Sequence, residues 1–247
     1  MLAPTRHDAI LAALAEHGTV ATAELAEGLG VSVDTVRRDL HELETAGQLR
    51  RVHGGAVRTA PGKRRFVDRA QERTGGKAIV GALAARLIAP GQVVAIGGGT
   101  TALELARHVA PELRATVVTT SPDVALALRD LPDVDVIVHG GRLDRTSQTL
   151  VGPETIAQIG MLRPDALLVG ACSLHHELGL TMRERDEAQV MRALAERAGR
   201  VVVLATGEKL GTAAPYVVCE RVDTLVSDAP AAQLAPYEQA GIEVVRP

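Results

Sequence analysis

The stretch VSVDTVRRDL, residues 31–40, decides the fold expected for the N-terminal part of the chain. Apolar side chains recur at helical spacing within and just behind it: Val33, Val36, Leu40 and Leu43. This spacing predicts a helix with one buried stripe, and Ser32 is a residue type that caps helix N-termini. At about 100° per residue, Arg38 lies nearly opposite the stripe, with Arg37 on one flank and Asp39 on the other.

The N-terminal half of this helix carries side chains suited to reading DNA. Ser32, Thr35 and Arg38 are expected to face outward, and this half of a recognition helix is what meets the base edges in the major groove. Arginine suits the task because its fork can bond guanine bidentately or hold a phosphate. An exposed arginine pair on a solvated helix is the alternative, and the neighbouring segments decide between the two.

Two shorter helices are expected before this one. TRHDAILAALAEHG, residues 5–18, has Thr5 as its expected N-cap and Gly18 as its end. TAELAEGLG, residues 22–30, follows with Thr22 as its expected N-cap. Three short helices joined by tight turns predict a helix-turn-helix arrangement.

A basic hairpin is expected directly behind the third helix. QLRRVHGGAVR, residues 48–58, is typical of two short strands around Gly54–Gly55. A basic hairpin at this position is a wing, and wings contact the DNA backbone or the minor groove. We therefore predict a winged helix-turn-helix domain over residues 1–58. Its expected contacts to double-stranded operator DNA are Ser32, Thr35, Arg37, Arg38, Arg50, Arg51 and His53.

Composition limits the other kinds of function. The formal net charge of -3 does not exclude DNA binding, because affinity depends on the local field over one face. Aromatic residues make up 1% of the chain, which disfavours binding of single-stranded nucleic acid by stacking. Cys172 and Cys219 lack metal or redox spacing, and the adjacent His175 and His176 are expected in a solvated loop. We therefore predict no metal site and no cofactor.

Segments that would place the chain in a membrane are not expected. No apolar run reaches the length of a membrane helix. MLAPTRHDAI, residues 1–10, lacks the basic-then-apolar order of a signal peptide. We expect a cytoplasmic protein with no membrane partner.

The pattern changes after residue 77 to short apolar runs that alternate with helical ones. The expected strands are 93–96, 116–120, 134–140, 166–170, 201–205, 223–227 and 242–245. The expected helices include 101–109, 122–129, 153–160, 185–198 and 230–240. This alternation predicts a Rossmann-like, mostly parallel α/β domain over residues 78–247, with helices on both faces of the sheet.

Residues 59–77 are polar and basic and are expected to form a linker with a short helical piece. Phe66 is expected to anchor this segment against a domain. Lys63, Arg64 and Arg65 either add phosphate contacts or are simply solvated. The chain as a whole is expected to be an α/β protein with a small and a large domain.

The loops at the strand ends of the second domain predict an anion site. Parallel α/β folds bind ligands at the carboxyl ends of their strands, where glycines and a helix N-terminus present free N–H groups. Gly97–Thr101 has this form, although a glycine-rich turn can also be just a turn, and Lys209 is the expected fixed positive charge. The residues expected to hold the ligand are Gly97, Gly98, Gly99, Thr100, Thr101, Thr119, Gly140, Gly141, Arg142 and Lys209.

ELAEGLGVSVDTVRRDLHELETAGQLRRVHGGAV, residues 24–57, resembles the N-terminal signature of the DeoR family of bacterial transcription regulators. The second domain is similar to the sensor domain of that family through its GTT loop, VVTTSPDVA, HGGR, GLT and EKLG. The resemblance covers nearly the whole chain. It implies a sensor fold related to ribose-5-phosphate isomerase and CoA transferases. It also implies an effector that is a phosphorylated sugar or a related metabolite.

The chain departs from the family pattern near the expected site, at Gly97, Thr120, Met191 and Thr206. The family often has an aspartate where Gly97 stands, which would bond sugar hydroxyls. The effector therefore differs from the common ones, or the site is degenerate. The arginines that could compensate are Arg142, Arg183 and Arg192.

These features predict a transcriptional repressor of a carbohydrate operon, released from its operator by a phosphorylated metabolite. One recognition helix covers few base pairs, so a homodimer or homotetramer is expected. The alternative is a sugar-phosphate isomerase-like enzyme with an accessory DNA-binding domain. That chemistry needs a pocket carboxylate with a perturbed pKa, for which Asp165, Glu177 and Glu208 are the few candidates. We expect no catalytic residue.

Overall fold

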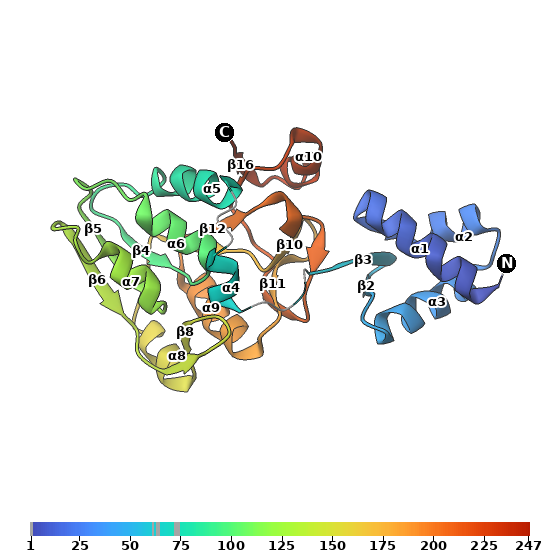
Figure 1. Cartoon of the computed structure of the whole chain (residues 1–247), viewed down its shortest axis with the longest axis horizontal. Helices are drawn as coiled ribbons and strands as arrows, with labels where there is room; N and C mark the ends of the chain where they lie inside the picture. Colours follow the sequence, from blue (N-terminus) through green and yellow to red (C-terminus); the bar gives the residue numbers. More distant parts are fainter. Residues whose placement is uncertain (1, 61, 63–64, 72–74) are drawn as a thin grey trace.

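The structure of the protein, a computed structural model, describes residues 2–60, 62, 65–71 and 75–247. The N-terminal helices and hairpin lie at one end of the long axis, beside a larger α/β domain (Figure 1). Strand β3 (Gly55–Thr59) reaches from one to the other (Figure 1). Within the described residues, no helix is long and apolar enough to cross a membrane.

The N-terminal domain is a winged helix-turn-helix, as predicted. Its elements are α1 (Ala3–His17), β1 (Thr19–Ala21), α2 (Thr22–Leu29), α3 (Val33–Thr45), β2 (Leu49–Val52) and β3. Strand β3 pairs antiparallel with both β1 and β2, and the wing turns at Gly54, whose φ of 78° glycine adopts without strain. The core of the domain draws on all three helices and the wing: Ile10, Leu14, Leu25, Val36, Leu40, Leu43 and Leu49.

The starts of α1 and α2 differ from the sequence prediction. Helix α1 begins at Ala3, so Thr5 lies inside it and the predicted cap is wrong. Pro4 explains the earlier start, because its fixed φ suits the first turn of a helix. Helix α2 begins at Thr22 itself. The Thr22 N–H donates to the carbonyl of Gly54 at 2.7 Å. The wing backbone therefore pairs one of the N–H groups that the first turn of a helix leaves without a partner.

Helix α3 has the predicted cap and most of the predicted stripe. The Ser32 hydroxyl accepts a hydrogen bond from the Thr35 N–H at 3.2 Å. The buried stripe consists of Val36, Leu40 and Leu43. Val33 was wrongly included, because it lies in the first turn beyond the domain core and is 39% exposed. Asp39, expected on a flank, is 2% exposed because α1 supplies charged partners for it.

The segment between the domains contains α4 (Phe66–Gln71), which confirms the short helical piece. Phe66 is buried, and its N–H donates to the carbonyl of Thr146 at 2.9 Å. Helix α5 (Gly75–Ala85) begins within the predicted linker range 59–77. Arg65 is exposed, whereas Lys63 and Arg64 lie outside the described residues.

A parallel sheet forms the centre of the C-terminal domain, as predicted. Its strands are β4 (Val93–Ile96), β5 (Ala115–Thr119), β6 (Val134–Val138), β9 (Ala166–Gly170), β12 (Arg200–Ala205), β15 (Thr224–Ser227) and β16 (Glu243–Val245). The order across the sheet is β16-β15-β12-β9-β4-β5-β6. The chain adds β5 and β6 on one side of β4 and then returns to place β9 on the other side. The point where the order reverses therefore lies between β4 and β9.

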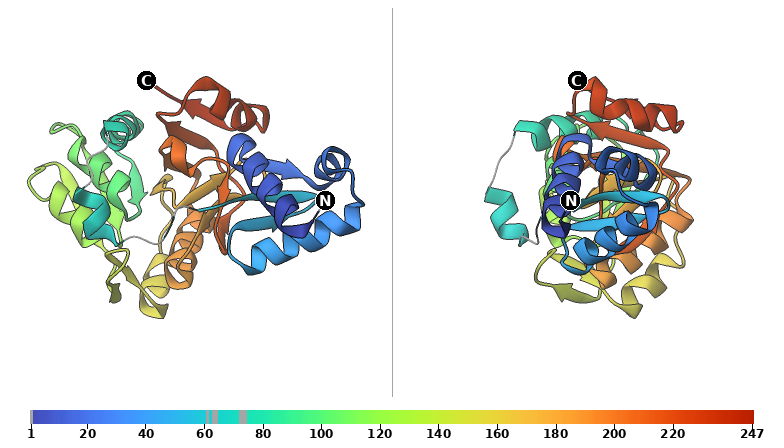
Figure 2. Two further views of the ribbon diagram at one scale, coloured as in Figure 1. Left: turned by 45° about the vertical axis from the view of Figure 1, so that its right-hand side comes forward. Right: turned by 90° about the vertical axis from the view of Figure 1, so that its right-hand side faces the viewer.

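Helices cover both faces of this sheet (Figure 2). Besides α5, they are α6 (Thr100–Arg107), α7 (Pro122–Leu128), α8 (Pro153–Ile159), α9 (Arg185–Arg197) and α10 (Ala231–Gln239). One hydrophobic core packs α5, α6 and α7 against the sheet, and a second packs α8, α9 and α10 against the other face. Side chains of successive strand residues enter opposite cores, as expected for strands buried on both faces.

The short antiparallel strands of the C-terminal domain were not predicted. They are β7 (Arg142–Asp144), β8 (Thr149–Val151), β10 (Ser173–His175), β11 (Gly179–Met182) and β14 (Tyr216–Cys219). Strand β13 (Thr212–Ala213) is parallel to β3 and joins the sheet of the N-terminal domain. The two domains therefore share one small sheet, made of β1, β2, β3 and β13.

Candidate DNA interface and effector pocket

The outward face of α3 carries the residues predicted to read bases. Ser32 and Arg38 are exposed and Thr35 is half-buried, with the Ser32 and Thr35 hydroxyl oxygens 2.9 Å apart. Arg37 forms an ion pair with Asp34 of the same helix, with 3.0 Å between its Nη1 and Oδ1 of Asp34. Arg38 makes no hydrogen bond or ion pair with any residue that the structure describes. Its guanidinium is therefore exposed and unpaired among the described residues.

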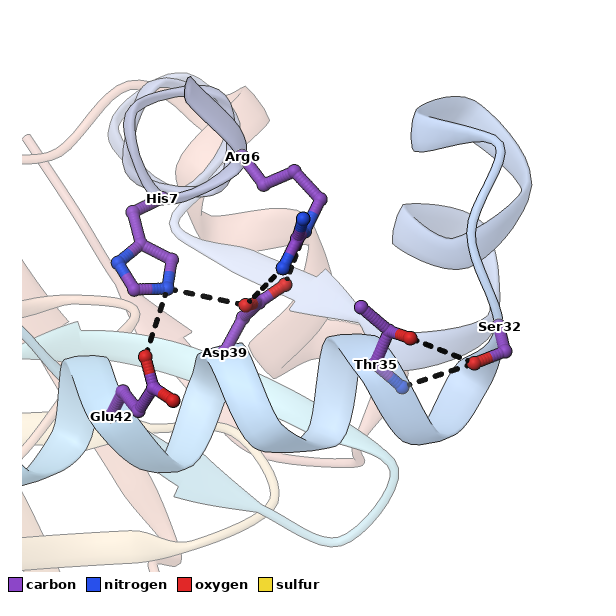
Figure 3. Close-up of polar contacts among 6 residues, drawn as sticks. All are labelled: Arg6, His7, Ser32, Thr35, Asp39 and Glu42. Carbon is purple, nitrogen blue, oxygen red and sulfur yellow. Dashed lines mark hydrogen bonds and ion pairs between the residues drawn. The ribbon is translucent and has the colours of Figure 1, made fainter. Parts of the chain in front are cut away.

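The other side of α3 is tied to α1 by a buried carboxylate (Figure 3). Both oxygens of Asp39 accept hydrogen bonds from Arg6, at 2.7 Å from Nε and at 2.7 Å from Nη2. His7 Nε2 lies 3.2 Å from the same carboxyl and 3.6 Å from Glu42. The Arg6 hydrogen bonds hold the pKa of Asp39 below its ordinary value. We call these four residues the α1–α3 clamp.

The α1–α3 clamp also places three metal-ligating side chains together. The ligand atoms of His7, Asp39 and Glu42 all lie within 4.8 Å of one another. However, the bidentate contact from Arg6 already uses both oxygens of Asp39. The positive charge of this guanidinium would repel a cation there, so the arrangement suits an ion-pair network better than a metal site.

His175 belongs to a second group that could ligate a metal, with His176 and Glu177. The predicted solvated loop is wrong here, because His175 is buried in β10 and burial lowers its pKa to about 4. Its Nδ1 accepts from the Glu177 N–H at 3.2 Å, so Nε2 carries the proton. That Nε2 faces the hydroxyl of Thr19 in β1 at 3.2 Å. Both ring nitrogens are therefore engaged, one of them across the boundary between the domains.

The wing presents its basic side chains beside the end of α3. Arg51 and His53 are exposed and Arg50 is half-buried. The N–H of Arg51 donates to Oε1 of Glu44 at 3.0 Å, which ties β2 to the last turn of α3. Gly55 lies so close to β1 that a Cβ there would be 2.0 Å from the carbonyl oxygen of Val20. These contacts hold the wing against α3 and β1.

A cavity of about 170 Å³ opens at the carboxyl ends of β4, β9 and β12. The three strand ends contribute Gly98, Gly99, Thr100, Thr101, Gly170, Ala171, Cys172, Thr206, Glu208 and Lys209. Because β4 and β9 flank the point where the strand order reverses, this is where a parallel α/β fold binds ligands. Helix α6 begins at Thr100, so its positive end lies at the cavity. Lys209 adds a cation, with Nζ 3.0 Å from the Glu208 carboxylate.

Half of the residues predicted to bind an anion line this cavity: Gly98, Gly99, Thr100, Thr101 and Lys209. Gly97 lies behind it, where a Cβ would come within 3.2 Å of the side chains of Met191 and Val169. The Thr119 hydroxyl is buried and donates to the carbonyl of Ile96 at 2.7 Å. Gly97 and Thr119 thus pack behind the Gly98–Thr101 loop and do not line the cavity.

The HGGR loop does not line the cavity; it packs against α8 and α9. The N–H of Gly140 donates to the side chain of Gln158 at 3.0 Å. A Cβ at Gly141 would lie 2.0 Å from the Thr155 hydroxyl. Arg142 forms an ion pair with Asp186 at 2.5 Å. Glycine at position 141 therefore serves close packing of the turn, whereas a Cβ at Gly140 would meet only the Gln158 side chain, at 3.8 Å.

Charged residues from other elements also line the cavity: Arg69, Lys77, Arg183, Glu184 and Glu187. Of these, the sequence singled out only Arg183. Burial raises the pKa of Glu187 to about 7, and the charge of Arg69 acts in the opposite direction. Glu187 lies in the first turn of α9, where acidic residues are common on any helix, so its sequence context carried no signal. The cavity is thus lined by several cationic side chains and by one carboxyl group whose pKa lies near 7.

The residues that depart from the family pattern differ in how deeply they are buried. Thr206 lines the cavity. Thr120 and Met191 are fully buried, and Met191 packs beneath Gly97. Of the arginines expected to compensate, Arg183 lines the cavity, whereas Arg192 donates to the carbonyl of Val217.

Comparison with known proteins finds relatives over nearly the whole chain. The family model of the DeoR-like helix-turn-helix domain matches residues 6–61, and that of the DeoR C terminal sensor domain matches residues 72–229. The HTH-type transcriptional regulator GlpR of Haloferax volcanii is 35% identical, over 90% of this chain and 89% of its own. The transcriptional repressor AccR of Agrobacterium fabrum is 32% identical, over 90% and 88%. The HTH-type transcriptional repressor GlcR of Bacillus subtilis is 30% identical, over 89% and 86%.

Solved structures resemble the chain more distantly. Ribose 5-phosphate isomerase A of Methanocaldococcus jannaschii is 16% identical, with a TM-score of 0.38 over 51% of this chain and 50% of its own. A likeness of this size carries no argument about activity, and the expected relation of the C-terminal domain to this isomerase stays a prediction.

Proposed function

The chain belongs to the DeoR family of transcriptional regulators, and from that premise we propose a repressor that a small phosphorylated ligand releases from its operator. Two relatives, GlcR and AccR, are named as repressors. The observation that carries the ligand class is the cavity where the start of α6 and Lys209 face one space. A phosphorylated sugar fits this chemistry, because its phosphate meets these groups and its hydroxyls meet Glu187. We therefore propose a carbohydrate operon as the target.

Arg38 is proposed to make the principal base contact. It is exposed on α3, and the α1–α3 clamp holds the helix from its other side. Arg38→Ala should weaken binding by about 5- to 150-fold, the loss expected for one bidentate arginine contact. Fluorescence anisotropy with a duplex from upstream of the chain's own gene measures this. Arg163→Ala, which changes an exposed arginine in the loop between α8 and β9, is the control and should bind as wild type does.

The ligand proposal is tested by thermal shift with a panel of sugar phosphates. A ligand that binds only the native state raises its stability by about 2.7 kcal/mol at a hundred times its Kd. At least one member should raise the Tm of wild type, and Lys209→Ala should reduce that rise. Unphosphorylated sugars should have no effect. An equal rise with and without the phosphate would contradict the role given to Lys209 and the α6 N-terminus.

We propose that two or more copies assemble through the C-terminal domain, because one recognition helix contacts few base pairs. Strand β6 is an edge of the parallel sheet, and apolar side chains are exposed on it and beside it: Leu126, Ile137, Val138 and Leu143. Leu126, which is 59% exposed, tests whether this edge is the contact. Light scattering should give a dimer or tetramer for wild type and a smaller species for Leu126→Glu.

Glu187 is the observation that favours the second candidate function, an isomerase-like enzyme. A pocket carboxyl with a pKa of about 7 is what a general base requires. The carboxylates considered from the sequence fit less well. Asp165 accepts from the N–H of Val93 at 2.8 Å, and Glu177 is exposed. Glu208 lines the cavity, but its side chain is 62% exposed and paired with Lys209. We propose that Glu187 binds ligand without turnover, since the relatives that match along the chain are regulators. Turnover of ribose 5-phosphate that Glu187→Gln abolishes would favour the enzyme.

A further inference from the structure

The two domains are joined by backbone pairing at the end of the wing strand. Strand β13 lies parallel to β3, beside Arg58 and Thr59. The N–H of Ala60 extends this pairing by donating to the carbonyl of Ala213 at 2.9 Å. Because β3 also pairs with β1 and β2, any movement of β13 acts on the strand that carries the wing.

The same junction continues directly into the cavity wall. Lys209 lines the cavity, and its carbonyl accepts a hydrogen bond from the Thr212 hydroxyl at 2.8 Å. Between them, the carbonyl of Leu210 accepts from Nη2 of Arg58 at 3.2 Å. Arg58 therefore faces the C-terminal domain. The segment that follows Lys209 is therefore hydrogen-bonded directly to strand β3, through Leu210 and Arg58.

Arg183 connects the cavity to this junction a second time. It lines the cavity, and its Nη2 donates to the carbonyl of Ala60. Ala60 is buried, and its peptide groups are held on both sides, by β13 through the N–H and by Arg183 through the carbonyl. The Arg183 guanidinium thus lines the cavity and also holds the backbone at the end of strand β3.

We propose that Arg183 couples the cavity to the DNA-binding domain: an anion in the cavity takes the Arg183 guanidinium from the carbonyl of Ala60 and so loosens the junction between β3 and β13. This inference rests on the proposed function, because it requires the cavity to bind an anion. It adds a route by which occupancy of the cavity changes the orientation of α3 and the wing.

The charges give the direction of this exchange. A guanidinium bonds phosphate bidentately with charge on both partners, whereas a carbonyl is a neutral acceptor. Either bidentate face of arginine uses Nη2, as Arg6 does with Asp39, and Nη2 is the atom that holds Ala60. The Ala60 carbonyl occupies one of the two N–H groups of Nη2, so a bidentate contact on that face of the guanidinium forms only after the bond to Ala60 breaks, and the proposed exchange takes place on this face. A ligand shifts an equilibrium by binding one state more tightly, and this contact supplies that difference.

Hydrogen–deuterium exchange of the full chain tests the proposal, with inorganic phosphate as the probe. Saturating phosphate should speed exchange in peptides covering 58–60 by about tenfold, relative to sodium chloride at the same ionic strength. Arg183→Ala should exchange fast in this segment already without phosphate and should not respond to it. Arg192→Ala is the matched control, because that arginine also donates to a backbone carbonyl but does not line the cavity. It should behave as wild type does.

The outcomes separate this proposal from the one it rests on. If phosphate raises the Tm of wild type but leaves exchange of 58–60 unchanged, the coupling through Arg183 is wrong and the anion cavity stands. If phosphate neither binds nor stabilises wild type, the proposed ligand site is wrong and the coupling is wrong with it. The wild-type measurement decides both cases, even if Arg183→Ala does not fold.

Discussion

Asp39→Asn tests whether the α1–α3 clamp holds the recognition helix. The change keeps the shape of the side chain but removes its charge. It also replaces one acceptor oxygen with an NH2 group that faces a donor. Three contacts are affected, two from Arg6 at 2.7 Å and one from His7 at 3.2 Å. The variant should therefore loosen α3 from α1 without opening a cavity.

The size of the effect follows from the burial of the three groups. Hydrogen bonds to charged groups contribute about 1.5–3 kcal/mol. The Asp39 side chain is 3% exposed, but those of Arg6 and His7 are 13% and 22% exposed, so water screens the partners in part. We expect Asp39→Asn to lower the free energy of unfolding of the N-terminal domain by about 2 kcal/mol.

Urea unfolding followed by circular dichroism measures this loss, since the chain has no tryptophan. Asp34→Asn is the matched control, because Asp34 lies on the same helix and pairs with Arg37 at 3.0 Å but is 84% exposed. It should change stability by less than about 0.5 kcal/mol. If the two variants were equally stable, the buried contacts would contribute no more than an exposed pair, and Asp39 would not hold α3 against α1.

The stability difference between wild type and Asp39→Asn should depend on pH, which gives a second test of the α1–α3 clamp. The folded pKa of Asp39 lies below its ordinary 3.8, so its stabilisation is present above pH 3.8 and is lost as the pH falls through the lowered pKa. The gap between wild type and Asp39→Asn should shrink as the pH falls below about 3.8. A gap that persists undiminished in acid would show that charge is not its source.

Three other substitutions test separate parts of the fold. Burial raises the pKa of Glu187 from 4.5 to about 7, so wild type should lose stability as the pH rises from 4.5 through 7, whereas the Tm of Glu187→Gln should lack this decline. Gly55→Ala puts a Cβ 2.0 Å from the Val20 carbonyl oxygen and should cost about 1–3 kcal/mol in urea unfolding; no cost would mean that β1 and β3 are not in close contact. Leu40→Ala empties a buried position and should cost about 2–5 kcal/mol by the same assay, and a cost below about 1 kcal/mol would contradict its place in the core.

Local and periodic features were predictable from the sequence. The Ser32 cap needs only the residues that follow it, and the exposure of Arg38 follows from its phase on one helix. The parallel sheet follows from the alternation of strand and helix patterns. The position of Gly98–Thr101 and Lys209 beside one cavity was predictable because loops at strand ends in such a sheet meet at one edge.

Features that depend on distant partners were not predictable. Asp39 is buried because Arg6 lies opposite it, 33 residues away in the sequence. Arg142 has the chemistry of an anion ligand, but the structure pairs it with Asp186. Strand β13 is two residues long, too short for a periodic pattern, so the shared sheet between the domains had no sequence signal.

Release of DNA by a ligand is the most direct test of the regulator proposed here. A complex of wild type with a labelled duplex from upstream of its own gene is titrated with sugar phosphates while anisotropy is followed. At least one should release the DNA, and Lys209→Ala should bind the duplex as wild type does but resist release. Binding that no sugar phosphate reverses, or release that is equal in Lys209→Ala, would rule out regulation through this cavity.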